Sequence, residues 1–181
     1  MTCVASVIQG NRVFMGSDSV GASNHYISYR RHGKVFRNGS YLMGYTSSFR
    51  MGQLLQYNLE IPKRTEIDLM AHMVKTFIPA VRACLKDGGY ATIKENAERG
   101  GCFLVAHQDS LFQINDDFQV AQEIGSYDAV GCGADIAKGS LYSTQNTEFS
   151  GKKRILLALE AAAHHSGWVA PPFTVMELKI K

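Results

Sequence analysis

The order of strand and helix patterns constrains the fold of this 181-residue chain more than any other feature. Strand patterns fill residues 1–46, helical patterns follow, and strand patterns return from Cys102 to Gly131. Two more helical patterns then precede a last strand. Runs of antiparallel strands separated by pairs of helices are typical of two packed sheets with helices outside. We therefore predict an α+β fold, a four-layer α-β-β-α sandwich of two antiparallel sheets, in a single domain spanning residues 1–181.

The N-terminal strands should form a hairpin. Thr2 to Ile8 is rich in small and β-branched residues, Gly10-Asn11 is a turn signal, and Arg12 to Met15 continues as the partner strand. We expect Gly16-Ser17-Asp18-Ser19 to break this pattern. A second hairpin should pair Lys34–Arg37 with Ser40–Tyr45 around Asn38-Gly39, which is a type I′ turn signal.

The middle of the chain should contain a long amphipathic helix. Its apolar stripe, at intervals of three and four, consists of Ile67, Met70, Ala71, Val74, Phe77 and Ile78. Pro79 should kink or interrupt this helix, and the polar stretch up to Gly100 should form a surface loop or short helix. The remaining expected elements are strands at Cys102–His107, Leu111–Asn115, Tyr127–Gly131 and Phe173–Ile180, and helices from Ala134 to about Tyr142 and from Lys152 to about His165.

Composition and charge exclude several classes of partner. Hydrophobic residues make up 45% and charged residues 19% of the chain, which is ordinary for a globular protein with a sizeable core. The net charge of +3 is too small to indicate nucleic-acid binding. No apolar run approaches the roughly 18 residues that span a membrane. We therefore expect neither a nucleic-acid nor a membrane partner.

The N-terminus and the cysteines indicate a cytoplasmic protein. Residues Met1 to Val7 lack the basic segment and apolar core of a secretory signal. The four cysteines, Cys3, Cys84, Cys102 and Cys132, are widely spaced, which is typical of reduced thiols rather than of disulfides or a zinc site. His164 and His165 are neighbours and would point in different directions on a helix, so we expect a structural or surface role for them rather than a shared metal ion. We expect no metal and no cofactor.

Thr2 is a candidate nucleophile because it directly follows Met1, and Met is removed in cells before small residues. Removal would place an α-amine, whose reference pKa is about 8, on the same residue as the hydroxyl. The amine could accept the hydroxyl proton through a water molecule. The register of the first hairpin places Asp18 beside Thr2, and Lys34 begins the next strand pair. A buried ammonium would lower the pKa of the hydroxyl, and a carboxylate would keep that ammonium charged.

These segments resemble a known family. Thr2-Cys-Val-Ala-Ser-Val7, Gly16-Ser-Asp-Ser19, Gly33-Lys-Val35 and Gly44-Tyr-Thr-Ser-Ser48 are similar to the N-terminal half of proteasome β-subunits. They are also similar to HslV, the peptidase subunit of the bacterial two-component ATP-dependent protease. In those families Thr, Asp and Lys follow one another at the spacings found here, sixteen residues and then sixteen more. Tyr127 to Gly133 resembles the family's Val-Gly-Ser-Gly segment.

The resemblance implies a threonine endopeptidase, an N-terminal-nucleophile hydrolase within a self-compartmentalising protease. Thr2, Asp18 and Lys34 would be catalytic, and Ser47-Ser48 would supply the oxyanion donor and contact substrate. Cys132 and Ser166 would support the site. The implied partners are a peptide or unfolded protein substrate, identical subunits in a homo-oligomeric ring, and an ATP-dependent unfoldase.

Three departures from the family pattern affect this site. Ser47-Ser48 replace paired glycines, which should narrow the pocket but keep a backbone N–H as donor. Cys132 replaces a serine, and the supporting carboxylate is missing from His164 to Val169. Two alternatives therefore remain open: a non-catalytic structural ring protein of the same fold, and an N-terminal-nucleophile amidase acting on a small-molecule amide. The joint presence of Thr2, Asp18 and Lys34 favours the peptidase.

Overall fold

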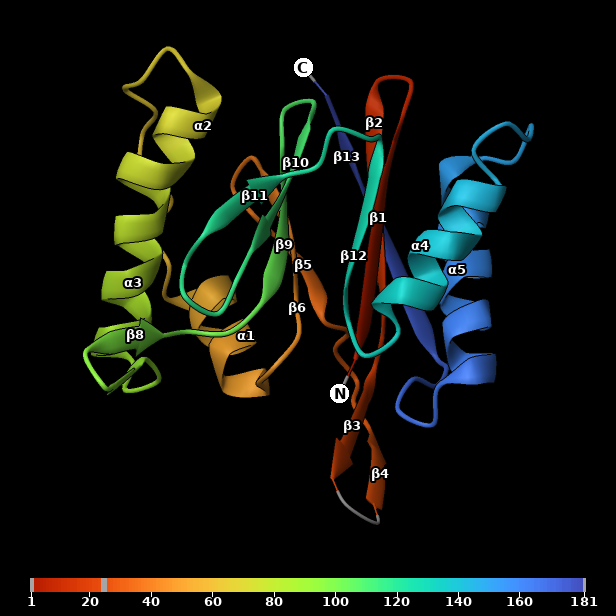
Figure 1. The fold of residues 1–181 in the computed structure, drawn as a ribbon, viewed down its shortest axis with the longest axis horizontal. Coiled ribbons are helices and arrows are strands. Elements are labelled where there is room, and N and C mark those ends of the chain that lie inside the picture. Colours follow the sequence, from red (N-terminus) through yellow and green to blue (C-terminus); the bar gives the residue numbers. More distant parts are fainter. Residues whose placement is uncertain (1, 24–25, 181) are drawn as a thin grey trace.

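The computed structural model describes residues 2–23 and 26–180, in which two antiparallel sheets face each other. Helices lie on the outer side of each sheet (Figure 1). The predicted α+β class with antiparallel sheets is confirmed. A layer of apolar residues that includes Val4, Met15, Leu42 and Leu104 fills the space between the sheets.

The first sheet has the strand order β12-β1-β2-β13. Its strands are β1 (Cys3–Gln9), β2 (Arg12–Asp18), β12 (Tyr127–Gly131) and β13 (Phe173–Lys179). The β1–β2 hairpin pairs Val4 with Ser17, so Cys3 and Asp18 lie at the same end of the sheet. The predicted hairpin is confirmed, but the expected break at Gly16–Ser19 is wrong, because β2 continues to Asp18. The polar side chains of Ser17 and Asp18 are buried at this end of β2, where they form hydrogen bonds within the candidate site described below.

The second sheet has the strand order β11-β10-β9-β6-β5. Its strands are β5 (Val35–Asn38), β6 (Tyr41–Tyr45), β9 (Phe103–His107), β10 (Ser110–Ile114) and β11 (Val120–Gln122). Asn38 pairs with Tyr41, so the β5–β6 turn consists of Gly39 and Ser40, one residue later than predicted. Gly39 has a φ of 58°, which glycine adopts without steric cost. Ser40 does not have positive φ, so the turn is not of type I′.

Helices cover both sheets in two groups (Figure 1). The helices α1 (Phe49–Tyr57), α2 (Leu69–His72) and α3 (Ile78–Asp87), with the π-helical turn η1 (Met73–Phe77), lie on the second sheet. Helices α4 (Ala134–Ser143) and α5 (Gly151–His165) cover the first sheet and match the two predicted C-terminal helices. Buried apolar side chains fill both helix–sheet interfaces.

The predicted effect of Pro79 takes the form of a wider turn rather than a break. Proline has no N–H to donate to the preceding helical turn, and η1 ends two residues before it. The helix then continues through Val81 and Leu85, both fully buried. Ile67 was placed wrongly in the apolar stripe, because it precedes the helix and is 97% exposed.

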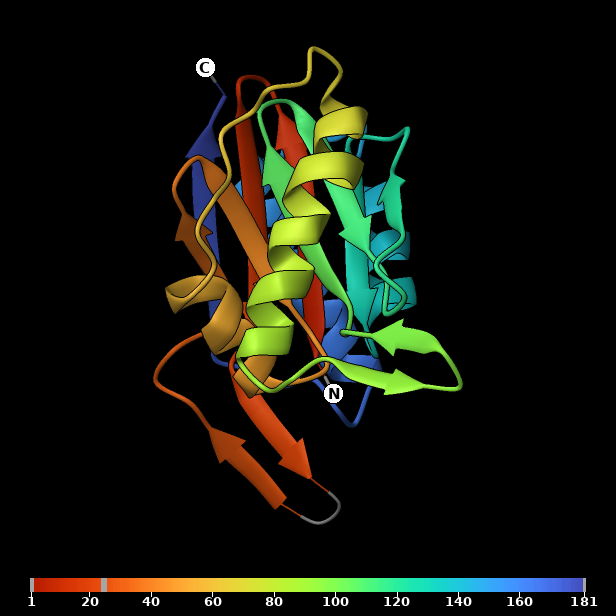
Figure 2. The same cartoon turned by 90° about the vertical axis from the view of Figure 1, so that its left-hand side faces the viewer.

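Two small hairpins were missed at the sequence level. Strands β3 (Val20–Ser23) and β4 (Tyr26–Tyr29) extend beyond the two sheets (Figure 2). Strands β7 (Thr92–Lys94) and β8 (Ala97–Arg99) replace the expected loop or short helix before Gly100. Glu95 and Asn96 between them both have positive φ, as in a type I′ turn. This hairpin lacks a buried face, so its sequence carries no apolar alternation.

In the described part of the chain, none of the helices combines the length and the apolar character needed to cross a lipid bilayer.

Candidate active site

Thr2, Asp18 and Lys34 meet in a buried cluster at one end of the first sheet. The Lys34 Nζ lies 2.7 Å from Thr2 Oγ1 and 2.7 Å from Asp18 Oδ2. The three residues are at most 3% exposed. These two contacts join the Lys34 ammonium to a hydroxyl and to a carboxylate, so the ammonium can act on the Thr2 oxygen while Asp18 balances its charge.

The strand register brings these three residues together. Cys3 donates its backbone N–H to Asp18 Oδ1 at 2.9 Å, and Val20 donates its backbone N–H to Asp18 Oδ2 at 3.3 Å. Lys34 lies directly before β5, and its backbone N–H donates to Ser17 Oγ at 3.1 Å. The end of β2 therefore holds both the carboxylate and the lysine backbone in place beside the start of β1.

Burial controls the protonation of the groups around Thr2. Burial lowers the pKa of Lys34 below its ordinary value, and the Asp18 carboxylate opposes this change. Burial, with a smaller contribution from Asp18, raises the pKa of the Cys3 thiol to about 12. Cys3 therefore stays protonated at neutral pH and is a poor nucleophile, although it neighbours Thr2 in sequence.

Thr2 and Lys34 line a cavity of about 330 Å³. Ser47 and Ser48 line the same cavity, so the structure brings the predicted oxyanion residues to the predicted catalytic residues. The backbone N–H of Ser48 donates to the Thr46 carbonyl at 2.6 Å, across Ser47, whose φ is 56°. An oxyanion would have to share or take over this donor. The Ser48 hydroxyl caps α1 by accepting the N–H of Arg50 at 3.0 Å.

Ser47 occupies the left-handed region of backbone conformation, which is uncommon for residues other than glycine. Its hydroxyl accepts the backbone N–H of Cys102 at 3.1 Å and contacts the Thr46 hydroxyl at 3.3 Å. These contacts attach the loop to the start of β9 and hold the backbone beside the cavity. A strained backbone at the edge of a cavity is a feature of many functional sites.

The two predicted supporting residues lie outside this cavity in the described part of the chain. Cys132 is exposed, but its flanking glycines touch Thr2. A Cβ on Gly131 would lie 2.2 Å from the Thr2 carbonyl oxygen, and the Gly133 N–H is 3.5 Å from that oxygen. Ser166 follows α5, where its hydroxyl accepts the backbone N–H of Trp168 at 3.4 Å. Support for Thr2 from this motif therefore comes from glycine backbone contacts.

Several cavity residues were not predicted. Gly21, Tyr45, Thr46, Phe49 and Arg50 line it with the residues named above. The Lys34 Nζ lies 5.7 Å from the centre of the Phe49 ring, within the range of a cation–π contact. Tyr45 and Phe49 flank Ser47-Ser48 in sequence and could have been inferred from that motif. Gly21 belongs to the hairpin that was missed, so no signal pointed to it.

The described residues do not assemble a metal centre, because no group of three or more His, Cys, Asp or Glu side chains converges on one point. His164 and His165 are exposed, and their rings are nearly perpendicular at 86°. The groups that line the cavity and could take part in chemistry include the hydroxyl of Thr2 and the ammonium of Lys34.

Comparison with known proteins places this fold among proteasome-type subunits. No family model matches the chain, and no curated protein matches its sequence. BPH from Thiobacillus denitrificans, in complex with epoxomicin, is similar with a TM-score of 0.84 at 18% identity, covering 99% of this chain and 100% of that chain. A second structure of BPH gives 0.82 at 17% identity, with 99% of both chains covered.

HslV from Trypanosoma brucei is similar with a TM-score of 0.70 at 15% identity, covering 98% of this chain and 99% of that chain. These likenesses establish that the chain has the fold of HslV-like, proteasome-type subunits. The resemblance inferred from the sequence is confirmed at the level of the fold.

Proposed function

We propose that this chain is a threonine-type peptidase, with Thr2 as its nucleophile after removal of Met1. Met1 itself lies outside the described residues. The observation that carries the proposal is the position of Lys34 Nζ, 2.7 Å from both Thr2 Oγ1 and Asp18 Oδ2 in a buried site. We further propose that this site belongs to a four-layer N-terminal-nucleophile hydrolase domain, which the fold likeness to proteasome-type subunits supports.

The reaction would begin with the α-amine of the exposed Thr2. This amine accepts the hydroxyl proton through water, and the Lys34 ammonium stabilises the negative charge that develops on Oγ1. Oγ1 then attacks the peptide carbonyl carbon, and the negative oxygen of the tetrahedral intermediate binds the backbone N–H of Ser48. Return of the proton to the leaving amine breaks the peptide bond and leaves an ester on Thr2, which water hydrolyses.

We further propose that the substrate is a peptide or unfolded protein and that the chain acts in a cytoplasmic homo-oligomeric ring fed by an ATP-dependent unfoldase. The fold likeness to HslV supports this assembly. Tyr26, Ile27 and Tyr29 on the β3–β4 hairpin are 54–78% exposed and offer apolar surface for a contact between subunits. Light scattering that gave a stable monomer at micromolar concentration would contradict the ring.

The direct test compares two forms of the same chain. A cleavable fusion that releases Thr2 as the first residue should yield an enzyme that hydrolyses a fluorogenic peptide amide. The form that keeps Met1 should be inactive, because the nitrogen of Thr2 is then an amide and cannot act as a base. Thr2→Ser should keep part of the activity of the released form, since the hydroxyl remains, and Thr2→Ala should have none.

Other outcomes would favour the remaining alternatives. Equal hydrolysis by the two forms would exclude the N-terminal amine as base. An inactive released form that still assembles into rings would indicate a structural ring protein. Hydrolysis confined to small amides by an open monomer would indicate an amidase.

A further inference from the structure

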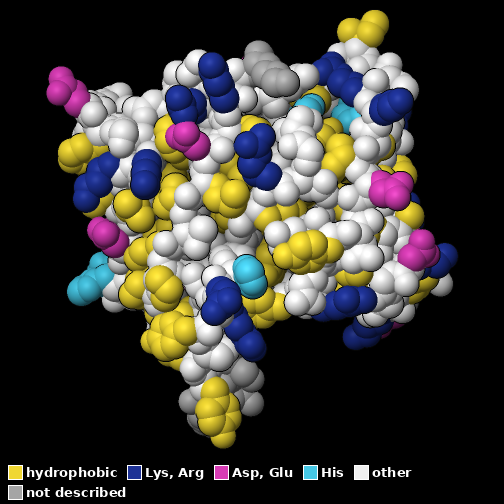
Figure 3. Space-filling model, turned by 180° about the vertical axis from the view of Figure 1, so that it is seen from behind, with side chains coloured by type: hydrophobic (Ala, Val, Ile, Leu, Met, Phe, Trp, Pro, Cys, Tyr) yellow, Lys and Arg dark blue, Asp and Glu magenta, His cyan; other side chains and the backbone are white. Residues whose placement is uncertain are grey.

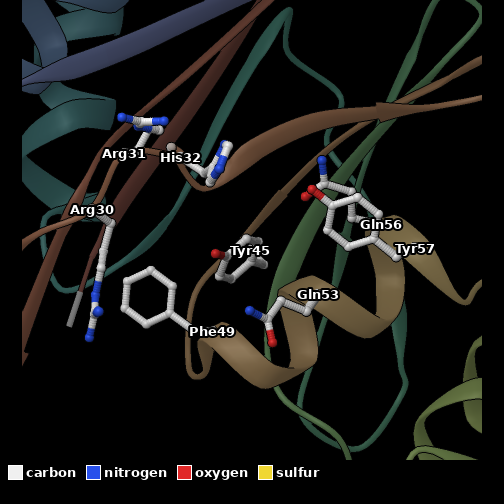
Figure 4. A pocket seen from close by; sticks show the side chains of 9 residues that line it. Arg30, Arg31, His32, Tyr45, Phe49, Gln53, Gln56 and Tyr57 are labelled. Carbon is white, nitrogen blue, oxygen red and sulfur yellow. The ribbon is translucent and has the colours of Figure 1, made fainter.

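A second pocket of about 350 Å³ lies beside the Thr2 cavity and has no role in the proposed chemistry. We name it the arginine pocket. Its basic lining consists of Arg30, Arg31 and His32, just before Lys34, and its aromatic wall includes Tyr45, Phe49 and Tyr57. Figure 4 shows the Arg30 side chain beside the Phe49 ring and the His32 ring near Tyr45.

The arginine pocket adjoins the Thr2 cavity. Tyr45 and Phe49 line both, so one continuous ligand could reach from Thr2 into the second pocket. The Arg30 guanidinium carbon lies 5.4 Å from the centre of the Phe49 ring. A Cβ built on Gly21, which lines the Thr2 cavity, would lie 3.6 Å from Arg30 Nε. Arg30 therefore stands at the boundary between the two spaces.

The lining of the two spaces is basic. Arg30, Arg31, Lys34 and Arg50 contribute four cationic side chains, and the lining residues include no carboxylate. Lys34 is paired with Asp18, but no ion pair between described residues involves Arg30, Arg31 or Arg50. Arginine stays charged at all physiological pH values. Basic and histidine side chains gather on the surface above the β3–β4 hairpin (Figure 3). This end of the molecule therefore attracts anions.

We propose that the arginine pocket binds an acidic side chain of the peptide substrate close to the bond that Thr2 attacks. This inference rests on the proposed function and adds a preference for Glu or Asp near the cleaved bond. A guanidinium can donate two parallel hydrogen bonds to a carboxylate. The aromatic wall can pack against the methylene groups of the same side chain, and Gln53 and Gln56 at the edge supply further polar contacts.

The test uses end-blocked fluorogenic peptides that differ only by Glu or Gln at the residue bearing the attacked carbonyl or at the residue before it. The released form should cleave the better Glu peptide with a kcat/KM about three- to tenfold above its Gln partner at low ionic strength, because the arginines are exposed. High salt should bring the ratio towards one. Equal rates for Glu and Gln peptides at both positions would overturn the inference.

Variants locate the preference. Arg30→Gln should lower the Glu-to-Gln ratio, Arg30→Lys should keep part of it, and Arg30→Glu should favour a Lys peptide instead. The matched control is Arg37→Gln, because Arg37 is an exposed arginine that lines a different pocket with His107. It should leave the ratio unchanged. An equal loss of preference in Arg37→Gln would assign the effect to net charge and contradict the pocket.

A binding measurement separates this inference from the proposed function. The Thr2→Ala chain should bind the labelled Glu peptide more tightly than the Gln peptide in fluorescence anisotropy, whether or not any form is catalytic. Equal binding would overturn the pocket even for an active peptidase. A Gln peptide with a free C-terminal carboxylate should bind more weakly than the end-blocked Glu peptide. If it binds as tightly, the pocket recognises a chain end and the side-chain preference is wrong.

Discussion

Two buried polar clusters lie at opposite ends of β6 and differ in what surrounds them. Tyr45, the last residue of the strand, lines the cavity that holds Thr2 and Lys34. Tyr41, the first residue, contacts a second cluster formed with Glu66, His72 and His107. Both clusters combine a carboxylate with a basic side chain, so their composition alone does not distinguish their roles.

The second cluster is closed by packing. Tyr41 and His72 are buried, with the Tyr41 hydroxyl 3.0 Å from His72 Nε2, and Glu66 Oε2 lies 3.1 Å from His72 Nδ1. The Tyr41 ring stacks on Phe77 at 5.0 Å and on His107 at 4.0 Å. This cluster therefore connects the loop before α2, which carries Glu66, to His72 of α2 and to Tyr41 and His107 of the second sheet.

The difference lies in access to a nucleophile. The Lys34 cluster places a hydroxyl at the wall of a cavity, whereas aromatic rings cover the Tyr41 phenol. Burial and hydrogen bonding identify both clusters as important to the protein. His107 of the second cluster borders a separate pocket, but neither Tyr41 nor His72 is among the residues that line it. Of the two clusters, the first is therefore the one that presents a hydroxyl to a cavity. Substitutions in the first cluster should therefore reduce activity, with or without a loss of stability, whereas substitutions in the second should reduce stability and leave the activity of the folded protein nearly unchanged.

The largest expected effect is that of Lys34→Ala on the released form. Loss of the ammonium beside Thr2 Oγ1 should lower kcat/KM by at least about a thousandfold. The variant should also lose stability, because Asp18 remains buried without its cation. Steady-state kinetics with a peptide amide and chemical denaturation measure the two effects.

A double variant separates these effects. Adding Asp18→Asn to Lys34→Ala should recover part of the lost stability, since the unpaired charge is gone, and should recover no activity. Recovery of activity would contradict the role of Lys34 as the stabilising cation.

The second-largest effect is expected for His72→Ala, which tests whether the second cluster contributes to stability and not to activity. The substitution leaves Tyr41 and Glu66 without their shared partner and opens a cavity in the core. The free energy of unfolding should therefore fall by about 2–4 kcal/mol. The kcat/KM of the folded fraction should stay close to that of the parent. His164→Ala, at an exposed position on α5, is the matched control and should change neither quantity. A large loss of kcat/KM in folded His72→Ala would contradict the assignment of the second cluster to stability alone.

The sequence predicts one of these clusters far better than the other. Thr2 and Asp18 belong to one hairpin, so its register placed them together, and the family spacing added Lys34. Glu66, His72 and Tyr41 meet through a long loop and a helix, and no local pattern specifies that contact. Ile67 was misplaced for the same reason, because apolar spacing does not reveal where a loop ends. Exposed hairpins such as β7–β8 have no buried face, so their sequences lack the alternation of apolar and polar residues that predicts a strand.

The smallest effect concerns acid pH. The hydroxyl of Thr76, which donates to Glu66 Oε1 at 2.6 Å, and then His72 lower the pKa of Glu66 to about 2 from its ordinary value of 4.5. A carboxylate with a lowered pKa stabilises the fold fully above its unfolded value, and this contribution is lost as pH falls from about 4.5 to about 2. The stability of the parent should therefore fall more steeply over this range than that of Glu66→Gln. Parallel denaturation curves for the two proteins at each pH would contradict this contribution.

The central claim is that Thr2, in its cluster with Lys34, is the reactive group of this protein. The most direct measurement is to treat the released form with a peptide epoxyketone and to locate the added mass by peptide mass spectrometry. The account predicts one adduct on the fragment that begins at Thr2, and no adduct in the form that keeps Met1 or in Thr2→Ala. An adduct on Cys132 or Cys3 would contradict the account and indicate a thiol enzyme, and a fully released chain without any adduct would contradict a catalytic Thr2.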